Sequence, residues 1–177
     1  MMKKWFIALT SLFFLASSAG LLFSAENSEE PRKPRVLFLC TGNSCRSQMA
    51  EGWAKALIGD RFEIYSAGIT PHGLNPNAVK VMGEAGVDIT PQKSEDIADY
   101  KDFPLDVIIT VCPNAHEAYP DYLNEFKVIH HPFPDPPKVA KEIAEKGGSE
   151  EEQLECYRTV RDAIKAYVET LPETLAE

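Results

Sequence analysis

Residues 35–47 read RVLFLCTGNSCRS, and this stretch decides the fold. Residues 35–39 form a short apolar run, which is typical of a strand that is covered on both faces. From Ser47 the apolar residues recur at helical spacing as far as Ile58, and Gly59 follows them. The sequence therefore predicts a strand, a tight loop and a helix in direct succession.

The same alternation continues along the chain. We expect strands at 62–66, 106–111 and 127–130, and a helix that begins at Asn75-Pro76 and ends at Gly86. Ser149 and Glu152 form a capping box that opens a long final helix. The apolar stripe of that helix is Tyr157, Val160, Ile164, Val168 and Leu171. This order predicts a single α/β domain with a four-stranded parallel sheet, helices on both faces and a ligand site at the carboxyl ends of the strands.

The first 34 residues have a different composition. Lys3 and Lys4 precede an uncharged, mostly apolar run at 5–23, which is the pattern of a secretory signal peptide. A run of this length also just spans a bilayer as an anchor. We expect residues 1–25 to be a signal peptide or an N-terminal membrane anchor, 26–34 a polar tether and 35–177 the folded domain. Export to a bacterial periplasm follows, with membrane contact only if the segment stays uncleaved. A cytoplasmic protein with a misleading start is the remaining alternative.

Charge and cysteine usage exclude several classes of protein. The net charge is −9 and the isoelectric point about 5.0, which argues against a nucleic-acid binder. A small anionic substrate stays compatible, because one local pocket can be positive on an acidic protein. Four cysteines are too few for a disulfide scaffold of this length. We expect a monomer.

The loop after the first strand carries the chemistry. Gly42 and Asn43 tolerate a left-handed backbone, so the loop can turn several N–H groups inward. The helix N-terminus adds partial positive charge, and Arg46 offers a two-pronged donor that matches a tetrahedral oxyanion. Cys40 in this field favours its thiolate and becomes a nucleophile. The predicted oxyanion-binding residues are Thr41, Gly42, Asn43, Ser44, Cys45, Arg46 and Ser47. The alternative is a buried strand-end cysteine and an unrelated surface arginine.

Residues 40–54 resemble the signature of the low-molecular-weight protein tyrosine phosphatase superfamily. Within it the chain is similar to the arsenate reductases that share the phosphatase fold and are recycled through thioredoxin. Gln48 stands where the phosphatases usually have proline, and other motifs also match the reductases. These motifs are Tyr65-Ser66-Ala67-Gly68, His72-Gly73, Asn75-Pro76 and Val111-Cys112. The resemblance covers residues 35–136 and resumes at 157–164.

The resemblance implies two more catalytic residues besides Cys40 and Arg46. Asp135, in the sequence Phe-Pro-Asp-Pro at 133–136, matches the acid that protonates the leaving oxygen. A solvated turn aspartate before proline is the alternative. Cys112 matches the cysteine that attacks the arsenic-bound first one, which implies a Cys40–Cys112 disulfide and an external, thioredoxin-like dithiol reductant. No cofactor is expected to stay bound, except a potassium ion that the resemblance implies at Asn43, Glu51, Ser66 and Glu95.

The chain departs from these reductases at several positions. Tyr119 stands where they commonly carry a third cysteine, so an outside dithiol must open the disulfide directly. Cys156 has no counterpart, and we expect a partly buried structural cysteine. Pro137 follows the acid motif where phosphatases often have an aromatic residue, and a longer charged insert occupies 138–148. Cys45 could also pair with Cys40 as a protective lock.

The sequence leads to one main function and two alternatives. The main prediction is an arsenate reductase that reduces arsenate to arsenite. The first alternative is a low-molecular-weight phosphatase, in which water resolves a phospho-cysteine on Cys40. The second is an exported oxyanion-binding or redox-responsive protein with little turnover. Cys112 separates the first two, because a phosphatase has no need of a thiol there.

Overall fold

The computed structural model describes residues 32–175. The predicted signal peptide or anchor at 1–25 and most of the predicted tether lie outside the described residues. The elements, in chain order, are β1 (Arg35–Cys40), α1 (Arg46–Ile58), β2 (Glu63–Gly68), α2 (Pro76–Glu84), the 3₁₀ helix η1 (Ile97–Tyr100), β3 (Val107–Thr110), α3 (Pro113–Ala118), the 3₁₀ helix η2 (Asp121–Glu125), β4 (Lys127–His130), α4 (Pro136–Glu145) and α5 (Glu150–Thr174). Within the described part of the chain, no helix is long and apolar enough to cross a membrane.

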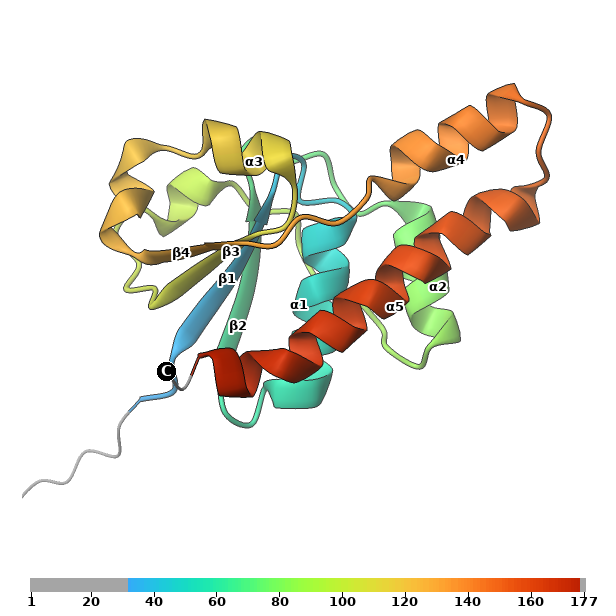
Figure 1. Cartoon of the computed structure of the whole chain (residues 1–177). Coiled ribbons are helices and arrows are strands. Elements are labelled where there is room, and N and C mark those ends of the chain that lie inside the picture. The colour runs from blue at the N-terminus through green and yellow to red at the C-terminus, as the bar shows by residue number, and fades with distance from the viewer. Residues whose placement is uncertain (1–31, 176–177) are drawn as a thin grey trace, which may run out of the picture. The chain divides into compact units, whose positions relative to one another are not determined.

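The four strands form one parallel sheet in the order β2-β1-β3-β4. β1 and β3 are central, and their apolar side chains from Val36 to Leu39 and from Val107 to Ile109 are buried. In Figure 1, α1, α2 and α5 lie on one side of the sheet and α3 lies on the other. The predicted fold class is therefore confirmed, and the carboxyl ends of β1 and β3 are adjacent, as a ligand site at that edge requires.

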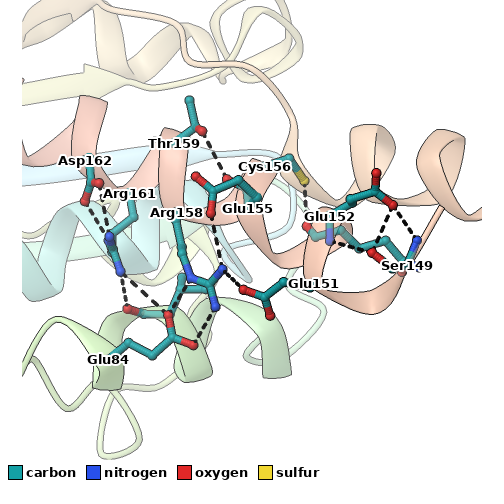
Figure 2. Close-up of polar contacts among 12 residues, drawn as sticks. Glu84, Ser149, Glu151, Glu152, Glu155, Cys156, Arg158, Thr159, Arg161 and Asp162 are labelled. Carbon is teal, nitrogen blue, oxygen red and sulfur yellow. Dashed lines mark hydrogen bonds and ion pairs between the residues drawn. The ribbon is translucent and has the colours of Figure 1, made fainter.

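The long helix α5 is fastened to the neighbouring helix α2 by charged side chains (Figure 2). The guanidinium of Arg158 donates to both carboxylate oxygens of Glu84, at 2.7 and 3.0 Å, and to Glu151 and Glu155 on its own helix. Ser149 and Glu152 form the predicted capping box at its start. Because α5 also packs along α1, this attachment helps to hold the helix that follows the oxyanion loop.

Four short elements were not predicted from the sequence: η1, α3, η2 and α4. The charged insert at 138–148 is mostly helix, because Pro136 and Pro137 start a helical turn and Ala140 supplies a small buried contact against α5. Lys138, Lys141, Glu142 and Glu145 alternate with the few apolar residues of this short helix, so its hydrophobic period is short and easily missed. The helix matters for function because it follows Asp135 directly.

Candidate active site

The loop of residues 40–46 joins β1 to α1 and forms the predicted concave turn. Asn43 has a φ of 42°, the left-handed conformation that such a turn requires. A Cβ on Gly42 would come within 2.7 Å of the His72 ring, so only glycine fits there without displacing that ring. Four backbone hydrogen bonds link the loop to the chain after β2, and in each a residue between 69 and 75 donates to a loop carbonyl. They are Ile69 N to Cys40 O, Thr70 N to Thr41 O, His72 N to Gly42 O and Asn75 N to Ser44 O.

Cys40 lies at the bottom of this loop and is 3% exposed. Its Sγ accepts a hydrogen bond from the backbone N–H of Asn43 at 3.1 Å, and Ser47 Oγ lies 2.9 Å away. Both groups can donate hydrogen bonds to this sulfur, so the loop holds it in place at the bottom of the turn.

A buried polar network fixes the conformation of Asn43. Its side-chain nitrogen donates to Ser47 Oγ at 2.9 Å and to Ser66 Oγ at 2.8 Å. Its side-chain oxygen accepts from Gln48 Nε2 at 3.0 Å and from the backbone N–H of Glu95 at 2.8 Å. Gln48 therefore holds the oxyanion loop in shape. In the sequence, Gln48 in place of the phosphatase proline indicated similarity to the reductases, but it did not reveal that Gln48 holds Asn43.

Arg46 and Asp135 meet at the open side of the loop, although they are far apart in the chain. Arg46 Nη2 lies 3.2 Å from Asp135 Oδ1, and Nη1 donates to the backbone oxygen of Phe133 at 3.3 Å. The Arg46 side chain is 13% exposed and that of Asp135 is 42% exposed. The guanidinium is thus held in place, while the carboxyl remains accessible to a ligand.

Cys112 ends up beside the same loop. It follows β3 and starts α3, is buried, and places its Sγ 3.5 Å from Thr41 Oγ1. Because β3 pairs with β1, Thr41 lies beside Cys112 at the carboxyl end of the two strands. The structure therefore brings together the four predicted catalytic residues Cys40, Arg46, Cys112 and Asp135.

The other two cysteines have different surroundings. Cys45 is buried in the loop, and this burial raises the pKa of its thiol. Cys156 on α5 is half-buried, and its thiol lies within hydrogen-bonding distance of Gln153 O and Pro136 O. Burial raises its pKa as well. All four thiols are free in this structure.

A cleft of about 780 Å³ opens above the loop. It joins the oxyanion loop to the acid segment, the start of α3 and the first turns of α4. Its lining includes Thr41, Gly42, Ser44, Arg46, His72, Cys112, Asn114, Phe133, Asp135 and Lys138. His72 and Lys138 were not predicted as site residues: His72 appeared only within a family motif, and Lys138 only within the charged insert.

The four side chains implied for potassium do gather, but most of their oxygens have protein partners. Glu51 Oε1 pairs with Lys55 Nζ at 2.5 Å, and Glu51 Oε2 accepts from Ser66 Oγ at 2.6 Å. Glu95 accepts from the Tyr100 hydroxyl. Asn43 turns its amide nitrogen, which cannot bind a cation, toward Ser66. This arrangement does not fit potassium, because the Lys55 ammonium already supplies the positive charge. In residues 32–175, no cluster of three or more histidine, cysteine or acidic side chains could hold a metal ion.

Comparison with protein-family models gives one match over residues 35–177, to the low molecular weight phosphotyrosine protein phosphatase family. The chain belongs to this family. The resemblance that the sequence showed is thereby confirmed, and the match extends across the segment from 137 to 156 that the resemblance left out.

Curated relatives in this family are named arsenate reductases. One from Halalkalibacterium halodurans is 44% identical over 142 residues, which cover 80% of this chain and 97% of that protein. One from Bacillus subtilis is 45% identical over 139 residues, covering 78% and 95%. Among solved structures, an arsenate reductase in a reduced state matches with a TM-score of 0.64 and 33% identity, covering 80% of this chain and 98% of that one. The family fold and these relatives support an enzyme.

Proposed function

We propose that this protein reduces arsenate to arsenite. The observation that carries the proposal is the placement of a second buried thiol, Cys112, next to the oxyanion loop that surrounds Cys40. A phosphatase needs only the loop and an acid. A reductase also needs a second thiol that can reach the first, because two electrons must pass to arsenic.

The first step is nucleophilic attack on bound arsenate. The N–H groups of the loop and the guanidinium of Arg46 bind the oxyanion and offset its charge. The Cys40 thiolate attacks arsenic and forms a sulfur–arsenic bond, while one arsenic–oxygen bond breaks. Asp135 gives its proton to the departing oxygen, which leaves as water. Arsenic remains in the +5 state at this stage.

The second step is the reduction. The Cys112 thiolate attacks Cys40 Sγ and forms a disulfide. The sulfur–arsenic bond breaks, and its electron pair stays on arsenic, which leaves as arsenite in the +3 state. Two thiols are thereby oxidised for one arsenic reduced, so the electrons balance.

We infer that an external dithiol protein of the thioredoxin type reopens the Cys40–Cys112 disulfide. The Tyr119 hydroxyl, at the end of α3, donates to Asn124 Oδ1 at 2.9 Å. A tyrosine cannot take up the disulfide and pass it outward, so the reductant must attack the cysteine pair itself. We also propose that the protein is exported and works as a monomer. A fusion of residues 1–34 to a reporter that is active only outside the cytoplasm tests the export.

Cys112→Ser tests the assignment. We expect the variant to lose multiple-turnover arsenate reduction, with hydrolysis of an aryl phosphate nearly unchanged, because water can resolve a phospho-cysteine without Cys112. Wild-type protein treated with arsenate should give a Cys40–Cys112 peptide in mass spectrometry. Arsenate reduction by Cys112→Ser at the wild-type rate, or a bond between Cys40 and Cys45 alone, would favour the phosphatase instead.

A further inference from the structure

Two histidines and a threonine meet on the segment that carries Cys112, and the proposed reaction does not use them. Thr110 is the last residue of β3, and His130 of β4 is its direct partner in the sheet register. His116 reaches the same place from α3. The hydroxyl of Thr110 lies 2.8 Å from His130 Nδ1 and 3.2 Å from His116 Nδ1. We call Thr110, His116 and His130 the histidine clamp.

Both histidines of the clamp are exposed, and charging both imidazoles weakens their contact. The two rings stack at 4.1 Å between centroids and 21° between planes, so two positive charges there would repel each other. A single hydroxyl lies between both rings: it can donate to one neutral Nδ1 and accept from the N–H of the other ring, and Ile129 O at 3.4 Å is a competing acceptor for its proton. His130 is exposed at the end of β4, and slight desolvation, followed by the neighbouring His116, lowers its pKa.

Few other charged groups face the clamp. On α3, Glu117 lies close enough to His130 to favour its charged form, and the Tyr119 ring lies 5.8 Å from His116. After β4, His131 follows His130 in the chain but stacks on Tyr167 of α5 at 3.7 Å. Glu117 thus opposes the lowering of the His130 pKa by slight desolvation and by the paired His116 ring.

The clamp holds the helix that places Cys112. α3 has six residues, which is too short for a helix to persist without tertiary contacts. Cys112 is its N-cap residue, and the backbone N–H of His116 donates to Cys112 O at 3.2 Å. The His116 side chain then ties this turn to β3 and β4. With the turn docked, Cys112 Sγ stays beside Thr41 and the oxyanion loop.

We propose that His116 is a positioning residue for Cys112 and that protonation of the histidine clamp releases α3 and slows the thiol-to-thiol step. This inference rests on the proposed function, because it concerns the step in which Cys112 attacks Cys40. The first step, attack of Cys40 on the oxyanion, touches no residue of the clamp and is unaffected.

The test compares the wild-type protein with His116→Gln in a single turnover. Reduced protein is mixed with arsenate, and formation of the Cys40–Cys112 disulfide is followed by rapid quenching across the pH range of histidine. The wild-type rate divided by the variant rate is the informative quantity, since ionisation of the thiols affects both proteins equally. Loss of one hydrogen-bonded anchor predicts a ratio of about fivefold at pH about 8, falling to about one at pH about 5.5.

Further variants show whether the clamp itself is responsible. Thr110→Ser keeps the hydroxyl and should behave like the wild type, whereas Thr110→Val should behave like His116→Gln. His131→Gln is the matched control, because it removes a neighbouring histidine that does not touch α3, and its profile should keep the wild-type shape. A ratio that stays at one, or stays constant across pH, would overturn the proposal.

A second measurement does not depend on arsenate chemistry. In the resting, reduced protein, protection of the residue 116 amide against hydrogen exchange reports whether α3 is docked. The wild type should lose protection on acidification, and His116→Gln should show low protection throughout. If wild-type protein forms no Cys40–Cys112 disulfide at any pH, the proposed function fails. Equal, pH-independent protection in both proteins refutes the clamp separately.

Discussion

Gly68 lies at the end of β2, and we expect the Gly68→Ala substitution to impair the site without unfolding the protein. A Cβ there would lie 2.7 Å from the backbone nitrogen of Asn43, 2.9 Å from Asn43 Cβ and 3.0 Å from the carbonyl carbon of Gly42. These atoms belong to the oxyanion loop and cannot rotate away as a flexible side chain would. To reach an ordinary contact of 3.4 Å, the Asn43 nitrogen must retreat by about 0.7 Å.

This displacement moves the donor that holds the nucleophile. The Asn43 nitrogen is the one that donates to Cys40 Sγ at 3.1 Å. A misplacement of about 1 Å costs about 10²-fold in rate, so Gly68→Ala should lower kcat/KM for arsenate by about 10- to 100-fold. Overpacking of this kind costs about 1–3 kcal/mol of folding free energy, which leaves most domains folded. Phosphate affinity, measured by calorimetry, should fall in parallel with activity.

Gly83→Ala is the matched control. Gly83 lies inside α2, and nothing stands within 4 Å of the position that its Cβ would take. Alanine should therefore stabilise the fold by up to about 1 kcal/mol through its higher helix propensity, which raises the melting temperature. It should leave phosphate affinity unchanged. Wild-type phosphate affinity and kcat/KM in folded Gly68→Ala would refute the idea that close packing of β2 shapes the loop.

Three more predictions follow from single contacts. Cys40→Ser should abolish arsenate reduction and any phosphatase activity, because an alcohol stays protonated near neutral pH; more than a few per cent of wild-type turnover would remove Cys40 from the mechanism. Wild-type turnover should be equal in potassium and sodium buffers, because Lys55 already neutralises Glu51. The Lys55→Gln variant should lose phosphate affinity and regain part of it when potassium is added. Wild-type turnover that depends on potassium would contradict this. Arg158 lowers the pKa of Glu84, so this ion pair stabilises the fold above the usual glutamate pKa of about 4.5 and loses its effect as pH falls through the lowered value. The difference in melting temperature between the wild type and Arg158→Gln should therefore shrink on acidification. A difference that does not depend on pH would exclude this pair as its source.

The sequence by itself determined the four strands, the helices α1, α2 and α5, and the loop that begins at Cys40. These features are local: an apolar run, a helical repeat and a Gly-Asn turn each act over a few neighbouring residues, so their pattern is visible without coordinates. The parallel sheet followed from their alternation, because parallel strands need crossover connections. The roles of Asp135 and Cys112 came from family resemblance, since nothing near them in the chain indicates chemistry.

Only the tertiary structure decided which distant side chains meet. Arg46 contacts the acid segment because β1 and β4 end at the same edge of the sheet, and no local pattern encodes that approach. The same holds for the stacking of His116 on His130, where the helix after one strand folds back over the end of another. Of the side chains expected to bind potassium, Glu51 instead pairs with Lys55 and accepts from Ser66, and Glu95 accepts from Tyr100. Side-chain direction and hydrogen-bond partners depend on packing between elements, and spacing along the chain carries no information about them.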